Sequence, residues 1–205
     1  MKGSLALLTL LPLSLAISGV DVSSPVDTFT CLKSSGYDFA IIRGYQSYGA
    51  VDPNAARTIA NAKSAGIAYV DTYFFPCVPC GNPAGQANAF WSALGGSFGT
   101  VWLDIEVYQW SSSSSANQNF ITTLANTLAG HGAKIGIYTS QYNWSSIVGS
   151  GWGAMSKYPL WYAHYDNNPS FSDFQPFGGW STPSIKQYNG GTSVCSASVD
   201  LNWYP

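Results

Sequence analysis

Short apolar stretches rich in β-branched and aromatic residues alternate with helical patterns along most of this chain of 205 residues. Strand-like stretches cover residues 20–23, 38–45, 68–75, 100–107 and 134–140, and helical spacing of apolar residues covers 53–65, 86–94 and 117–129. Strands that alternate with helices predict a parallel sheet or a barrel, because each helix returns the chain to the same edge of the sheet.

After residue 140 the pattern changes. Strand-like stretches continue at 159–165, 185–189 and 199–204, but the segments between them are rich in Gly, Ser, Pro and Asn and lack helical period, so we expect loops there. The whole pattern predicts an α/β fold, a modified and irregular TIM-like β/α barrel with about five β/α units and a strand-rich closing segment. An open doubly wound sheet is the alternative.

The N-terminus and the cysteines predict an exported protein. Lys2 precedes an apolar stretch too short to span a membrane, and small residues follow it, so we expect a signal peptide over 1–18 and a single domain over 19–205. An even number of cysteines in an oxidising compartment predicts two disulfides. Spacing does not fix their pairing; our first choice joins Cys77 to Cys80 and Cys31 to Cys195.

Charged residues are scarce, at 9% of the chain, and the formal net charge is −2. That balance disfavours nucleic acid and anionic membranes as partners. The chain has a single glutamate, Glu106, which lies with Asp104 inside the apolar stretch 100–107. Residues two apart on a strand face the same side, so both carboxyls are predicted to share one face. At the carboxyl end of a barrel strand such a pair is typical of a general acid beside a charged partner.

Other acidic residues fall in corresponding strand positions. Asp21, Asp71 and Asp200 lie in the first, third and last stretches, although a shift of one residue in register would turn Asp71 outward. The remaining aspartates lie in loop or cap contexts and are interpreted as structural. Aromatic residues at strand ends are expected to line the same mouth, among them Tyr45, Tyr73, Tyr138, Trp161 and Tyr165. Carboxyls among aromatic rings suit a neutral polymer of sugars.

Competing motifs lack the context that they need. The Gly95–Gly99 segment matches a serine-hydrolase elbow but follows a helix, and Cys77-Val78-Pro79-Cys80 has no second cysteine pair, so we predict neither a nucleophilic serine nor a metal site. Asn143-Trp144-Ser145 is an acceptable glycosylation sequon, and its occupancy is left open.

Ordered motifs from residue 19 to 204 resemble the lysozymes of glycoside hydrolase family 25, secreted muramidases, and the four cysteines point to the animal and protist branch. The motifs are Gly19-Val20-Asp21-Val22-Ser23, Val101-Trp102-Leu103-Asp104-Ile105-Glu106, Gly136-Ile137-Tyr138-Thr139, Leu160-Trp161-Tyr162-Ala163, Gln187-Tyr188 and Val199-Asp200-Leu201-Asn202. The resemblance implies hydrolysis of the β-1,4 bonds between N-acetylmuramic acid and N-acetylglucosamine in bacterial peptidoglycan.

Carried over by motif, the resemblance implies that Glu106 is the general acid and Asp104 its partner. Asp21 and Asp200 become flanking carboxylates, and the substrate contacts are Arg43, Tyr45, Tyr73, Tyr138, Trp161 and Gln187. The chain departs from the family at Tyr73-Phe74-Phe75, where a histidine is common.

Two alternatives remain, a carbohydrate-binding relative without activity and a chitinase-like glycosidase. Trp102 stands where the chitinase acid ladder has an aspartate. We expect a monomer without cofactor, and strand spacing does not decide between inversion and retention.

Overall fold

The strands of the computed structural model, which describes residues 16–205, form one closed barrel. They are β1 (Ile17–Val22), β2 (Tyr37–Gln46), β3 (Ala50–Val51), β4 (Tyr69–Phe74), β5 (Thr100–Asp104), β6 (Lys134–Thr139), β7 (Leu160–Ala163), β8 (Ile185–Val194) and β9 (Ala197–Tyr204). All but β3 belong to the barrel, and the pairing of β1 with β2 closes it. The expected irregular β/α barrel is confirmed, and the open sheet is wrong.

Strand direction distinguishes the closing strand from the rest. Neighbouring barrel strands are parallel to each other from β1 through β2 and β4 to β8. Strand β9 is antiparallel to both of its neighbours, β8 and β1. The amino half of β9 therefore lies at the same mouth as the carboxyl ends of the other barrel strands. The short strand β3 pairs with the end of β2 and, among the described strands, with no other, so it lies outside the ring.

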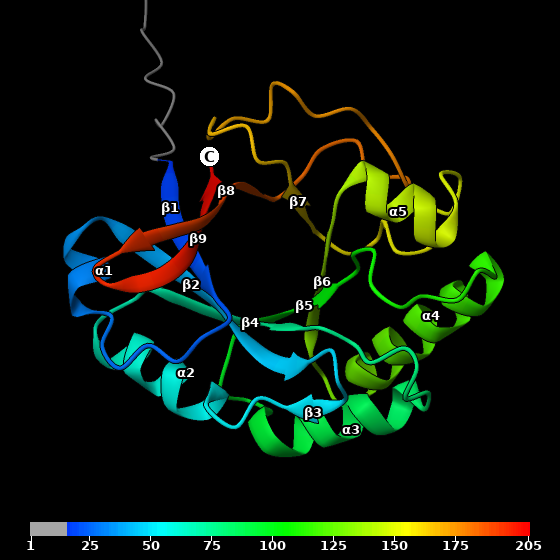
Figure 1. The fold of residues 1–205 in the computed structure, drawn as a ribbon, viewed down its shortest axis with the longest axis horizontal. Coiled ribbons are helices and arrows are strands. Elements are labelled where there is room, and N and C mark those ends of the chain that lie inside the picture. The colour runs from blue at the N-terminus through cyan, green and yellow to red at the C-terminus, as the bar shows by residue number, and fades with distance from the viewer. Residues whose placement is uncertain (1–15) are drawn as a thin grey trace, which may run out of the picture.

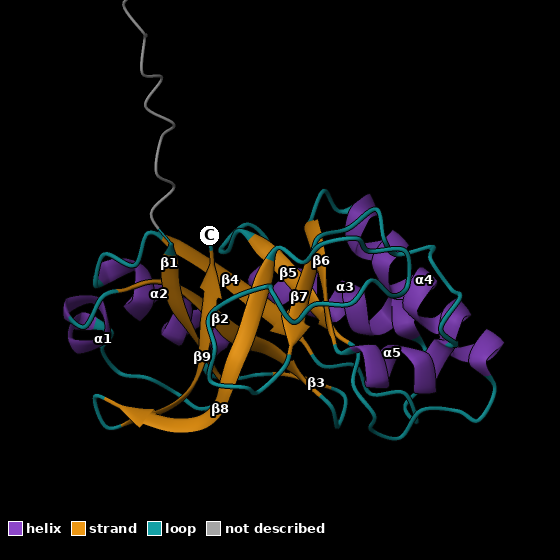
Figure 2. Cartoon of the chain, turned by 90° about the horizontal axis from the view of Figure 1, so that it is seen from above, coloured by secondary structure: helices purple, strands orange, loops and turns teal. Residues whose placement is uncertain are grey.

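Helices in the described part of the chain lie outside the strands (Figure 1). They are α1 (Thr30–Ser34), α2 (Ala55–Ser64), α3 (Pro83–Leu94), α4 (Ser114–Gly130) and α5 (Gln141–Val148). Viewed from above, α1 and α2 lie on one side of the strands and α4 and α5 on the other (Figure 2). The helices complete five β/α units, as expected, and two apolar clusters fill the space between them and the sheet.

Helix α5 contradicts the expectation that only loops join the strands after residue 140. Ser140 caps it by accepting a hydrogen bond from the backbone N–H of Asn143, and Trp144, Ile147 and Val148 are its buried residues. These three occupy a single i, i+3, i+4 set, which is shorter than the window from which a helical period can be recognised.

The interior of the barrel is mainly aromatic. Its buried residues are Phe39, Ile41, Tyr73, Trp102, Tyr138, Trp161 and Ile185. Glycine is required beside two of these rings: a Cβ on Gly19 would lie 2.4 Å from the ring of Phe39, and one on Gly136 would lie 2.2 Å from that of Trp102. The large rings therefore fit only because the adjacent strand has a glycine, without a side chain, at the paired position.

Both expected disulfides are present. Cys31 in α1 joins Cys195 in the turn between β8 and β9, and Cys77 joins Cys80. Most of the expected signal peptide lies outside the described residues, and Ile17 and Ser18 begin β1. In the described range, 16–205, no helix has both the length and the apolar character needed to cross a membrane.

We predict that Gly136→Ala destabilises the protein by about 1–3 kcal/mol, because its Cβ displaces the buried Trp102 ring. The matched control is Gly130→Ala at the end of α4, where a new Cβ meets nothing within 4 Å. It should leave stability unchanged or raise it by up to about 1 kcal/mol. Denaturant unfolding measures both, and equal stabilities would contradict the packing argument.

Candidate active site

A cavity of about 270 Å³ opens at the mouth where the carboxyl ends of the parallel strands meet. It is lined by Asp21, Ser23, Arg43, Tyr73, Phe75, Asp104, Glu106, Tyr138, Trp161, Tyr165, Gln187 and Asp200. Alternate residues of each strand face the interior, so the last inward residue of each one reaches this mouth. The four carboxyls expected to act together are therefore brought into one cavity.

Asp21 and Asp200 lie directly opposite each other on β1 and β9. The side-chain amide of Gln187 donates to both, at 2.8 Å to Asp21 Oδ2 and 3.1 Å to Asp200 Oδ2. Asn202 donates to the same Asp21 oxygen at 2.7 Å and is itself held by the indole N–H of Trp161. These amides stabilise the ionised form of two carboxylates that repel each other.

Gln187 is 2% exposed and uses its whole amide group in this arrangement. While its nitrogen donates to two aspartates, its oxygen accepts from the hydroxyls of Tyr138 at 2.6 Å and Tyr165 at 2.9 Å. An amide has two donor hydrogens and two acceptor positions, and all four are taken. Gln187 therefore organises the surrounding side chains and has no free hydrogen-bonding position for a substrate.

Asp104 reaches the cavity from a strand and Glu106 from the loop that follows it. Strand β5 ends at Asp104, and Glu106 lies beyond it, so the expectation that both lie on one strand is wrong. The loop stays aligned because Ile105 N donates to Tyr138 O at 2.9 Å and Ile105 O accepts from Thr139 Oγ1 at 2.7 Å. Asp104 is buried and its Oδ1 has no hydrogen-bond partner in the described residues, whereas Glu106 is partly exposed.

Burial raises the pKa of every carboxyl in the cavity, and repulsion between carboxylates raises it further for Asp21, Asp104 and Glu106. Burial, then the charge of Asp200, raises the pKa of Asp21 to about 7, against the opposing effect of the Asn202 and Gln187 amides. Burial and the charges of Glu106 and Asp21 raise the pKa of Asp104 well above its usual range. Burial and Asp200 raise that of Glu106, and burial raises that of Asp200. The cluster therefore retains protons at pH values where isolated carboxyls have lost them.

A second hollow of about 480 Å³ continues from the cavity. It shares Glu106, Tyr138 and Tyr165 with the cavity and extends over the start of α5 and past His164. Glu106 thus lies where the two hollows join. An elongated ligand that occupies both hollows must therefore lie against the Glu106 side chain.

Arg43, Tyr73, Tyr138 and Trp161 line the cavity as the sequence predicts. The Nε of Arg43 also donates to Asp52 Oδ2 at 2.9 Å, which fixes the arginine beside the mouth. Tyr165 also lines the mouth, as expected of an aromatic residue at a strand end. Ser23 and Phe75 line it too, though they were not among the candidate residues. Ser23 and Phe75 continue the inward alternation one step past Asp21 and Tyr73, a signal that was available in the sequence.

Tyr45 is not part of the site, contrary to expectation. The pairing of β2 with β4 shifts register between Arg43 and Tyr45, so Tyr45 turns to the outer face of the barrel. There it is 3% exposed and stacks on Phe74 with ring centroids 4.3 Å apart.

Asp71 is likewise absent from the mouth. It lies near the start of β4 and accepts hydrogen bonds from Thr100 N at 2.7 Å and Trp102 Nε1 at 2.9 Å. It lines a hollow with Tyr69 and Lys134, which are residues of the opposite end of the barrel. The sequence places Asp71 on a strand but does not indicate how far it lies from the end at the mouth.

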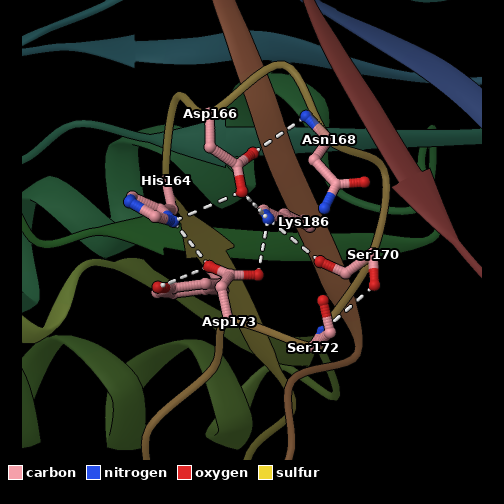
Figure 3. A network of polar contacts seen from close by, with 8 residues as sticks. His164, Asp166, Asn168, Ser170, Ser172, Asp173 and Lys186 are labelled. Atoms are coloured by element: carbon pink, nitrogen blue, oxygen red, sulfur yellow. Dashed lines mark hydrogen bonds and ion pairs between the residues drawn. The ribbon is translucent and has the colours of Figure 1, made fainter.

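A buried lysine holds the loop between β7 and β8 (Figure 3). Lys186, 0% exposed, donates at 2.7 Å to both Asp166 and Asp173 and at 2.9 Å to the carbonyl of Ser170. Potential metal-ligand atoms of His164, Asp166 and Asp173 lie within 4.8 Å of one another, but the lysine ammonium already supplies the positive charge there. The ion pairs tie the loop that carries Tyr165 to β8, the strand of Gln187.

Comparisons with known proteins agree on one family. A family model described as "Lysozyme-like protein 1" matches residues 14–188. "Probable GH family 25 lysozyme 2" of Dictyostelium discoideum is 56% identical over 93% of this chain and 92% of its own length, and "Lysozyme-like protein 5" of Caenorhabditis elegans is 40% identical over 94% and 93%. The muramidase structure from Trichobolus zukalii superposes with a TM-score of 0.77 at 25% identity, over 92% of this chain and 93% of that one.

The raised carboxyl pKa values predict an unusual pH dependence of stability. Between the ordinary aspartate value of 3.8 and about 7, folded Asp21 holds a proton that the unfolded chain has released. Raising the pH through this interval therefore favours unfolding, and the free energy of unfolding should fall. Asp104, Glu106 and Asp200 act in the same direction.

Denaturant titrations across the interval measure the effect. Asp21→Asn, which keeps an oxygen acceptor for the Asn202 amide but cannot ionise, should make the decline shallower. The lowered pKa values of Asp52, Asp166 and Asp173 act below the interval and do not mask it. Stability that rises with pH in the wild type, or an identical slope in the variant, would contradict the assignment.

Proposed function

The chain belongs to the lysozymes of glycoside hydrolase family 25, and from that premise we propose that it is a muramidase. Its substrate is bacterial peptidoglycan, and the bond that it hydrolyses is the β-1,4 link between N-acetylmuramic acid and N-acetylglucosamine. The observation that carries the proposal is the position of Glu106, a partly buried carboxyl with a raised pKa where two hollows join, beside three further carboxyls.

Glu106 is the general acid. Its raised pKa keeps a proton available at pH values where an ordinary glutamate has lost it, and the junction of the hollows brings the glycosidic oxygen of a bound glycan within its reach. Proton transfer to that oxygen lets the C1–O bond break with its electron pair going to the leaving sugar. Positive charge then develops on the sugar ring that remains.

The neighbouring carboxyls act on that developing charge. Asp104 is the partner that stabilises it or orients the substrate, and its unpartnered Oδ1 is free for a hydrogen bond to the sugar. Asp21 and Asp200 flank the site, fixed by Gln187. Arg43, Tyr73, Tyr138 and Trp161 contact the glycan, the aromatic rings through the apolar faces of the sugars.

We also propose that the enzyme is secreted as a monomer after removal of residues 1–18. Two disulfides support an oxidising destination, because cytosolic thiols are kept reduced.

We predict that Glu106→Gln reduces the release of reducing ends from bacterial cell walls at least about 100-fold, because the amide has similar shape but no acidic proton. The matched control is Asp27→Asn, which removes an exposed carboxyl paired with Arg57 and should leave activity unchanged. Unchanged activity of Glu106→Gln would refute the role of Glu106. If the wild type binds walls but releases no reducing ends, it is a carbohydrate-binding relative. If it releases reducing ends from chitin alone, it is a chitinase.

A separate prediction concerns pH. Activity should fall on the alkaline side as Glu106 loses its proton, above the ordinary glutamate pKa of 4.5. The charge of Asp200 raises the Glu106 pKa. In the activity that Asp200→Asn retains, the alkaline limb of the pH profile should therefore lie at lower pH than in the wild type. The measurement is the rate of wall hydrolysis from about pH 4 to about pH 8. A flat wild-type profile, or a limb that stays in place in the variant, would contradict this origin.

A further inference from the structure

Glu106 lies beyond the end of β5, where no regular ladder of strand hydrogen bonds holds its backbone. Two side chains take over this task at the peptide group that follows the residue. The indole Nε1 of Trp110 donates to the carbonyl oxygen of Glu106 at 2.7 Å. The backbone N–H of Val107, at the other end of the same peptide group, donates to the side-chain Oδ1 of Asn143 at 3.2 Å.

Asn143 is well fixed for this role. It lies in the first turn of α5, where Ser140 Oγ accepts from its backbone N–H at 3.1 Å. The next residue, Trp144, is fully buried, and its Nε1 donates to the carbonyl of Trp152 at 3.0 Å. Rotation of the helix would expose this tryptophan, so the Asn143 side chain is held against the loop that carries Glu106.

Asn143 also begins the sequon Asn143-Trp144-Ser145, and it lines the second hollow together with Glu106. An N-glycan is attached through the side-chain amide nitrogen. A sugar chain on Asn143 would therefore start inside the hollow of about 480 Å³ that the substrate is to occupy.

We propose that Asn143 is a positioning residue for Glu106, and that its place in the second hollow excludes an N-glycan at Asn143 in the active enzyme. The proposal rests on the proposed function, because it assigns Asn143 to the general acid of that reaction. The side-chain oxygen fixes the peptide group after Glu106 and thereby the direction in which the carboxyl enters the junction. Small displacements of a catalytic group are costly to rate, so loss of this acceptor acts mainly on kcat.

Three variants separate the parts of the proposal. Asn143→Leu keeps the branched shape of the side chain but removes the acceptor, and we expect kcat for wall hydrolysis to fall about ten- to 100-fold with little change in KM. Asn143→Asp keeps an oxygen acceptor and should restore most of kcat. Ser145→Ala removes the sequon but not the acceptor and should match the wild type. Equal kcat in Asn143→Leu and the wild type would overturn the positioning role.

Hydrogen exchange of the Val107 amide, followed by NMR, provides a readout that does not depend on activity. Exchange should be at least about fivefold faster in Asn143→Leu than in the wild type and in Asn143→Asp. Equal rates in all three would overturn the contact. If the wild type releases no reducing ends, the proposed function fails, while this measurement still decides whether Asn143 holds the loop.

The glycan is tested with protein from a host that glycosylates secreted chains. Glycosylated and unmodified wild-type chains are separated on a mannose-binding lectin and identified by intact mass, with Ser145→Ala as the unmodified reference. We expect the activity in the unmodified fraction and a loss of at least about tenfold in any chain that carries a glycan on Asn143. Glycosylated chains as active as Ser145→Ala would overturn the exclusion.

Discussion

The antiparallel pairing of β9 with β1 is the constraint on which the site depends. It sets Asp200 directly opposite Asp21, an arrangement in which two ionised side chains repel. The barrel accommodates the pair by giving both carboxyls donors from the Gln187 amide and by holding protons in the cluster. A slip of one residue in this register would turn Asp200 out of the barrel and remove the neighbouring charge that raises the pKa of Glu106.

The hairpin of β8 and β9 is also fixed by a disulfide at its turn, away from the cavity. Its turn carries Cys195, whose disulfide to Cys31 in α1 spans 164 residues of sequence and ties the end of the hairpin to the first helix (Figure 1). A cross-link over so long a loop restricts the unfolded chain strongly. This offsets part of the cost of burying Asp21 and Asp104 and of partly burying Glu106 and Asp200. The backbone N–H of Gly191, in the same hairpin, donates to Asp200.

Sequence reasoning recovered the carboxyls because alternation along a strand predicts which side chains share a face. It could not detect the register shift after Arg43, and so it placed Tyr45 inside the barrel. It also could not assign Asp71 to one end of the barrel. Alternation indicates which face of a strand a side chain lies on, but not how far along the strand axis it lies. The contacts that organise the site, from Gln187 to Asp21 and from Asn143 to Val107, join residues far apart in the chain and have no local pattern.

The different roles of Asp104 and Glu106 follow from how far each lies past the last strand pairing. Asp104 ends β5, so its side chain stays within the aromatic interior, buried and with one oxygen unpartnered. Two residues further on, Glu106 remains buried enough for a raised pKa but borders both hollows. A residue still on the strand would not reach the second hollow, and a residue further out would lose the burial that holds its proton. Because that position lies outside the sheet, the neighbouring β6 and α5 must supply the hydrogen bonds that keep the acid in place.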